Sequence, residues 1–93
     1  MSNREPTVKE VLDVLTEECA EVIHIISKIR RFGIDDVHPD TGISNYDKLQ
    51  EELVDLVTMV DWVDELTGWV PPEDEMYELM ENKRDKVRKY LRG

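Results

Sequence analysis

Two segments of this chain combine the apolar repeat of a buried helix with acidic residues inside the apolar stripe. The first, LTEECAEVIHII, covers residues 15–26, and the second, EELVDLVTMVDWV, covers residues 51–63. A helix that packs on a core normally fills such positions with apolar side chains. A fold that buries both stripes must also accommodate their carboxylates. This requirement limits the folds open to the chain more than any other feature of the sequence.

The acids of the two segments occupy matching positions on their helices. At about 100° per residue, Glu18 points into the apolar stripe of the first segment, and Glu21 lies about 60° to one side. Glu52 occupies the same place in the second segment, with Asp55 about 60° aside. If the two stripes pack together, four carboxylates converge in a water-poor interface.

Such a convergence predicts a bound cation. An uncompensated buried carboxylate costs several kcal/mol, and like charges within about 4 to 6 Å raise that cost. Mg²⁺, or Mn²⁺ in its place, prefers oxygen ligands and keeps part of its water shell. We therefore expect a carboxylate metal site. The alternative is that each acid lies at a helix edge and reaches water through its flexible stem.

The remaining pattern predicts an all-α protein. Thr7 and Glu10 can form a capping box at the start of the first helix, and Ser44 or Asn45 can cap the second. A glycine follows each of these two helices, and two prolines then force an extended connection to the third. We expect a single domain over residues 1–93, with three main helices at about 7–32, 45–67 and 73–92 and a loop at 33–44.

Charge and cysteine content narrow the range of partners and compartments. The chain has 22 acidic and 12 basic residues, for a formal net charge of -10. This charge opposes non-specific binding to nucleic acid or to an anionic membrane. Cys19 is the single cysteine, so it has no disulfide partner within the chain. No segment has the length of a spanning helix or the pattern of a signal peptide, and we expect a cytoplasmic protein.

The paired acidic motifs resemble those of a known enzyme family. Glu17-Glu18-x-x-Glu21 followed by Glu52-x-x-Asp55 is similar to the signature of the MazG-like all-α nucleoside triphosphate pyrophosphohydrolases, and the likeness extends over roughly residues 8 to 66. SKIRRFG and Asn45 look like the small phage and bacterial members.

The resemblance implies Mg²⁺-dependent hydrolysis of a nucleoside or deoxynucleoside triphosphate to the monophosphate and pyrophosphate. By position, Glu18, Glu21, Glu52 and Asp55 are implied as metal ligands. The resemblance implies that Glu17 either supports these ligands without binding the metal itself or positions the attacking water. The interval between the two motifs is longer than in the compact members, so base recognition in the 33–44 loop cannot be transferred.

Several other residues are candidates for substrate binding. Lys83 lies inside the apolar stripe of the third helix and Lys86 about 60° aside, so both can lean toward phosphates or simply reach solvent. Lys28 and Arg31 can meet phosphates or satisfy the end of the first helix. Two further candidates are Asn45, as a base contact or a cap, and Trp62, as a stacking platform or a core residue.

The width of the apolar surface predicts assembly. The second helix is apolar over roughly 220°, which is more than one partner helix covers. A homodimer, or a pair of dimers, would bury the remainder and complete a core like that of a four-helix bundle.

Two alternative functions stay open. The first is an acidic helical interaction module without catalysis, in which the apolar arc binds a helix of another protein. The second is a carboxylate di-iron bundle, suggested by the Glu-x-x-His pair of Glu21 and His24. The second helix has Asp55 followed by Thr58 in place of a matching pair, so we expect His24 at the surface or at an interface.

Overall fold

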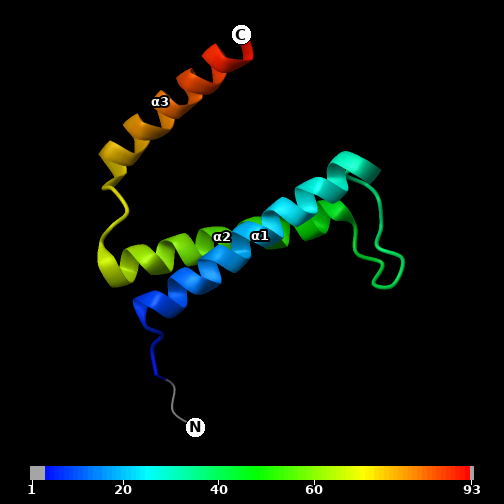
Figure 1. The fold of residues 1–93 in the computed structure, drawn as a ribbon, viewed down its shortest axis with the longest axis horizontal. Coiled ribbons are helices and arrows are strands. Elements are labelled where there is room, and N and C mark those ends of the chain that lie inside the picture. Colours follow the sequence, from blue (N-terminus) through cyan, green and yellow to red (C-terminus); the bar gives the residue numbers. More distant parts are fainter. Residues whose placement is uncertain (1–3, 93) are drawn as a thin grey trace.

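The computed structural model describes residues 4–92, and these residues form an all-α structure with three helices (Figure 1). Within this range no strand is present, and Val37 and Ser44 form an isolated β-bridge in the loop. The all-α prediction is therefore confirmed. The helices are α1, Val8–Phe32, α2, Asn45–Thr67, and α3, Glu73–Arg92.

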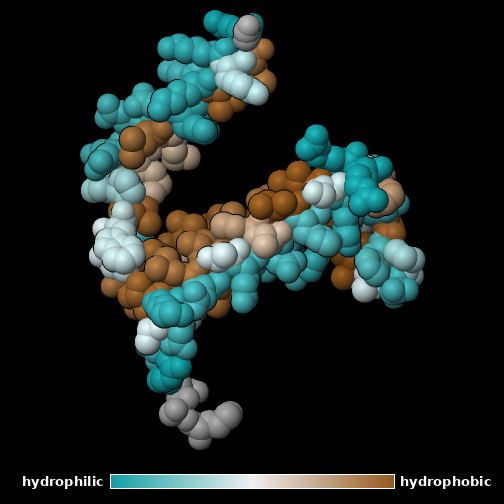
Figure 2. All heavy atoms as spheres, viewed as in Figure 1, coloured by the Kyte–Doolittle hydropathy of each residue, from teal (hydrophilic) through white to brown (hydrophobic). Residues whose placement is uncertain are grey.

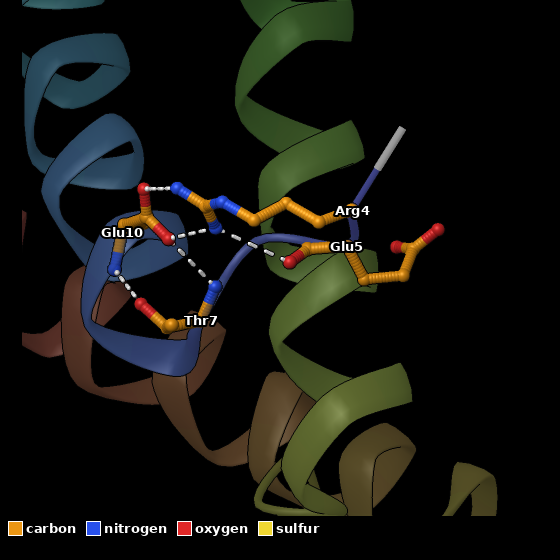
Figure 3. Close-up of polar contacts among 4 residues, drawn as sticks. All are labelled: Arg4, Glu5, Thr7 and Glu10. Carbon is orange, nitrogen blue, oxygen red and sulfur yellow. Dashed lines mark hydrogen bonds and ion pairs between the residues drawn. The ribbon is translucent and has the colours of Figure 1, made fainter. Parts of the chain in front are cut away.

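The start of α1 is fixed by hydrogen bonds that the sequence predicts. The Thr7 hydroxyl accepts from the Glu10 backbone N–H at 3.1 Å, and a Glu10 carboxylate oxygen accepts from the Thr7 N–H at 3.0 Å (Figure 3). This is a complete capping box. Arg4 adds a two-pronged ion pair to the same carboxylate, at 2.7 and 2.9 Å. The hydrogen bond from Arg4, followed by those from Thr7, lowers the pKa of Glu10 to about 2.

The loop between α1 and α2 folds back through its own backbone hydrogen bonds. The His38 N–H donates to the Ile43 carbonyl at 2.9 Å, and Gly33, with φ of 96°, allows the chain to leave α1. The Ser44 hydroxyl then caps α2 by accepting from the Asp47 N–H at 3.1 Å. Asn45 is buried, and its side-chain amide donates to the Gly33 carbonyl at 2.9 Å. This bond ties the end of α1 to the start of α2.

Helices α1 and α2 run antiparallel and pack side by side along their length (Figure 1). Their contact buries Val11, Met59 and Val63, with Leu15 and Trp62 packed against this cluster. Ile25 is also buried, nearer the loop end of α1. Four buried apolar side chains make a small core for the described residues. Such a core leaves most of the apolar surface of the pair exposed.

Helix α3 projects away from the α1–α2 pair (Figure 1). Gly68 ends α2 in the left-handed conformation, at φ of 68°, and Pro71 and Pro72 follow. Residues 73–92 make no close approach to α1 or α2, and none of them is buried. The radius of gyration is 16.8 Å, against about 12 Å for a compact domain of this length.

Hydrophobic residues gather along the α1–α2 pair and on the side of α3 that faces this pair across open space (Figure 2). Among the described helices, none is both long and apolar enough to span a membrane. The structure of residues 4–92 is thus a helical hairpin with an amphipathic arm, and the candidate site lies in the hairpin.

Candidate metal centre

Three carboxylates from the two acidic motifs meet between α1 and α2. Glu18 comes from α1, and Glu52 and Asp55 come from α2. Each offers one oxygen, and these three oxygens all lie within 4.8 Å of one another. Glu52 and Asp55 are three residues apart, so the helical repeat places them on adjacent turns of one face. Of the four acids predicted to converge, Glu18, Glu52 and Asp55 lie together, and Glu21 is not part of this group.

The burial of Glu52 and the partial burial of Glu18 make negative charge costly in this cluster. Glu52 is only 4% exposed and Glu18 is half-buried. The pKa of Glu18 is raised, first because burial disfavours its charged form and then because Asp55, Glu52, Glu21 and Glu17 are close. A carboxyl that resists ionisation beside two other acids is a place where a cation binds favourably.

The donor set fits a hard divalent cation. Two oxygens bound to one Mg²⁺ at about 2.1 Å are separated by about 4.2 Å at most. The three oxygens are within 4.8 Å of one another, which is close to this limit. The described group contains only carboxylates and no histidine, which matches the ligand preference of Mg²⁺ or Mn²⁺. Among the described residues, Glu18, Glu52 and Asp55 form a group with the chemistry to hold such a cation.

Lys48 also belongs to this centre, although the acidic motifs do not point to it. Its ammonium lies 2.9 Å from Glu52 and 3.7 Å from Glu51. The hydrogen bond to Glu52 is the main cause that raises the pKa of Lys48. The spacing of Lys48 and Glu52, four residues on one helix, is the signal that identifies this pair in the sequence. Part of the compensation for the buried acid thus comes from the chain itself.

Glu21 and Glu17 lie at the margin of the centre. Neither belongs to the group of three, but the charge of each contributes to the raised pKa of Glu18. Glu21 is one helical turn nearer the loop than Glu18, about 4.5 Å along the axis. Its side chain lines a cavity that adjoins the centre, and its charge also contributes to the raised pKa of Lys48.

This cavity lies at the loop end of the helix pair and has a volume of about 290 Å³. We call it the loop-end cavity. Basic and polar side chains are frequent in its wall, and Lys48 connects it to the carboxylates. The residues that line it are Glu21, His24, Ile25, Lys28, His38, Thr41, Ile43, Asn45 and Lys48.

The loop-end cavity gathers two of the predicted substrate-binding residues, Lys28 and Asn45. Arg31 lies elsewhere, in a surface hollow with Ser27 and Arg30, and its guanidinium stacks 5.1 Å from the centre of the Phe32 ring.

The other three substrate-binding candidates are remote from the loop-end cavity. Trp62 packs against the core cluster and lines a hollow near the start of α1. Lys83 and Lys86 line a hollow on α3, which makes no close approach to the carboxylates within the chain.

Comparisons with protein-family models, with curated proteins and with solved structures find no match for this chain. The resemblance to the MazG-like enzymes is therefore a likeness of sequence motifs, which no matched family model, protein or structure supports.

Proposed function

We propose that this protein is a Mg²⁺-dependent hydrolase that converts a nucleoside or deoxynucleoside triphosphate to the monophosphate and pyrophosphate. The observation that supports the proposal is the meeting of Glu18 with Glu52 and Asp55. These residues belong to a Glu-Glu-x-x-Glu motif on one helix and a Glu-x-x-Asp motif on its antiparallel neighbour. The same paired motifs carry the resemblance to the pyrophosphohydrolase family.

In this proposal the carboxylates bind and the surrounding chain orients the substrate. Glu18, Glu52 and Asp55 would hold the cation, and Glu21, which lines the loop-end cavity, is the fourth ligand that the resemblance implies. Mg²⁺ held by these residues would supply positive charge against the phosphates and would activate water for attack. Glu17 helps to position the attacking water. The lysines of the chain, and not a glycine-rich loop, bind the phosphates, because no GxxxxGK[ST] motif is present.

The proposed enzyme acts as a homodimer or as a pair of dimers. Within one chain, large apolar side chains of α2 such as Val54 and Val57 are 64% and 66% exposed. The apolar side of α3 is likewise uncovered in the described chain. A second copy presents the same surfaces and completes a bundle by symmetry. In such an assembly, α3 of one chain can bring Lys83 and Lys86 to the site of the other.

The test is a panel of common and modified nucleotides with identification of the products. We expect a monophosphate and pyrophosphate in equal amounts from at least one triphosphate, in the presence of Mg²⁺. Glu52→Gln abolishes this turnover. Glu65→Gln is the matched control, because it removes the same charge from an exposed position on the same helix. Stepwise release of inorganic phosphate, or no turnover of any nucleotide, contradicts the proposal.

A helical interaction module is the second candidate, and the exposed apolar faces of α2 and α3 favour it. In that case the acids only tune solubility, and the protein is indifferent to divalent cations. Melting curves with Mg²⁺ and with a chelator separate the two candidates, because a ligand that binds only the folded state raises the melting temperature. Iron-dependent colour or redox activity would instead support the di-iron bundle.

A further inference from the structure

The loop-end cavity has a composition that suits an anion. Lys28 projects into it from α1 and Lys48 from α2, and both are only partly exposed. Two histidines, His24 and His38, line the same space. Glu21 is the acidic residue in its wall, so the two lysines outnumber the acids even when both histidines are neutral.

We propose that the loop-end cavity binds the terminal phosphates of the triphosphate and the pyrophosphate that leaves, with Lys48 passing from Glu52 to a phosphate oxygen. This inference rests on the proposed function, since it assigns a binding site to the phosphate end of the proposed triphosphate substrate. It adds a site for the leaving group next to the carboxylates that hold the cation.

The pairing of Lys48 supports the exchange. Its ammonium lies 2.9 Å from Glu52, which is one of the three residues that can hold the cation. A cation and an ammonium compete for the same carboxylate, so cation binding weakens the hold of Glu52 on Lys48. The Lys48 side chain is 42% exposed and lines the cavity, and its flexible stem lets the three donors of the ammonium turn toward an anion there.

The size and the donors of the cavity favour phosphates over a whole nucleotide. Its volume of about 290 Å³ is just below the range for small-molecule sites, which is about 300 to 1,000 Å³. His38 Nδ1 accepts from the Asp40 backbone N–H at 3.1 Å, so the proton of the neutral ring is on Nε2, which remains a donor. Lysine ammonium groups and imidazole N–H groups are suitable donors for phosphate oxygens.

The wall of the cavity is already ordered by the fold. The Asn45 side chain bonds the Gly33 carbonyl at 2.9 Å, and the His38 N–H bonds the Ile43 carbonyl at 2.9 Å. These bonds fix the loop against the helix ends. An anion that enters therefore meets a preformed site, which reduces the ordering cost of binding.

The experiment is calorimetric titration of the full chain with inorganic pyrophosphate in the presence of Mg²⁺, and with Mg²⁺ alone. Each of Lys48→Gln and Lys28→Gln should weaken pyrophosphate binding by roughly tenfold or more, the usual effect of losing a charged hydrogen bond. Lys9→Gln is the matched control, since Lys9 carries the same charge at an exposed position on α1, paired with Asp13. It should bind pyrophosphate as the wild type does.

Titration with Mg²⁺ alone tests whether Lys48 leaves Glu52 when a cation binds or forms only a structural ion pair with it. Lys48→Gln should bind Mg²⁺ more tightly than the wild type, because no ammonium competes for Glu52. A structural role alone predicts unchanged or weaker Mg²⁺ binding. Lys48→Arg keeps the charge and should restore pyrophosphate binding. If Lys48→Gln does not fold, as judged by circular dichroism, Lys28→Gln and Lys48→Arg carry the test.

The inference is overturned if the wild type does not bind pyrophosphate with Mg²⁺, or if both lysine variants bind it within twofold of the wild type. It is also overturned if Lys48→Gln binds Mg²⁺ no more tightly than the wild type. Pyrophosphate binding that depends on both lysines, without turnover of any nucleotide, supports the anion site while contradicting the hydrolase proposal.

Discussion

The ammonium of Lys48 lies 2.9 Å from the carboxylate of Glu52, the one buried acid among residues 4–92. The pair joins two features of the molecule, because Glu52 belongs to the carboxylate cluster and Lys48 lines the loop-end cavity. In the absence of a divalent cation, this lysine compensates the buried charge. Lys48 should therefore contribute more to the stability of the protein without a divalent cation than to its stability with one.

We expect Lys48→Gln to lower the melting temperature in the presence of a chelator. Lys48 is 42% exposed, so the loss should be about 1 kcal/mol, or roughly 5 °C for a domain of this size. Saturating Mg²⁺ should reduce the loss, because the cation then compensates Glu52. Differential scanning calorimetry of both proteins, with chelator and with Mg²⁺, measures the two differences. Equal losses under both conditions contradict the account.

Glu18→Gln should have the opposite effect on the metal-free protein. Burial and four neighbouring acids raise the pKa of Glu18, so its charged form opposes folding at neutral pH. The variant should melt at a higher temperature than the wild type in chelator, and it should gain little from added Mg²⁺. Glu65→Gln, on the exposed part of α2, should show neither effect. A lower melting temperature for Glu18→Gln in chelator would count against the electrostatic picture.

The ion pair at the start of α1 predicts a separate dependence on pH. Arg4 and Thr7 lower the pKa of Glu10 from 4.5 to about 2. Because the folded-state pKa lies below the ordinary value, Glu10 contributes stability that is fully present above pH 4.5 and is lost as the pH falls to about 2. Chemical unfolding of the wild type and of Glu10→Gln over this interval measures the contribution. The variant should lose less stability than the wild type as the pH falls, and parallel curves would refute the assignment.

Assembly is tested by placing a charge on the exposed apolar face of α2. Val57 is 66% exposed and lines a surface hollow with Leu53, Val54, Thr58 and Asp61. In a homodimer that buries this face, Val57→Lys introduces a charge whose removal from water opposes association. Sedimentation should show a dimer or larger for the wild type and a shift toward monomer for the variant. Ser27→Lys, at an exposed polar position of α1, is the control. A wild-type monomer contradicts the prediction.

Much of the hairpin follows from local sequence signals. Thr7 with Glu10, and the glycines at positions 33 and 68, define helix ends through interactions within a few residues. The meeting of Glu18 with Glu52 follows from helical periodicity, because two neighbouring helices that bury apolar stripes pack those stripes against each other.

Other features depend on contacts that the periodicity does not contain. Glu21 is about 60° from Glu18 around the helix, so the periodicity places both on one face. Glu21 is also one turn nearer the loop than Glu18, and this position along the axis places it in the wall of the loop-end cavity. Lys48 shares a helix face with Glu52, although an acidic motif gives no reason to look one turn earlier. The helical periodicity of α3 predicts its apolar stripe, yet no other part of residues 4–92 covers this stripe.

Titration of the full protein with Mn²⁺, followed by electron paramagnetic resonance of the free ion, tests the metal centre most directly. Wild-type protein should bind Mn²⁺ and release it to excess Mg²⁺. Glu52→Gln and Asp55→Asn should bind at least roughly tenfold more weakly, while Glu65→Gln should match the wild type. Equal binding by all four proteins, or no binding by the wild type, would contradict the claim that carboxylates of α1 and α2 hold a divalent cation.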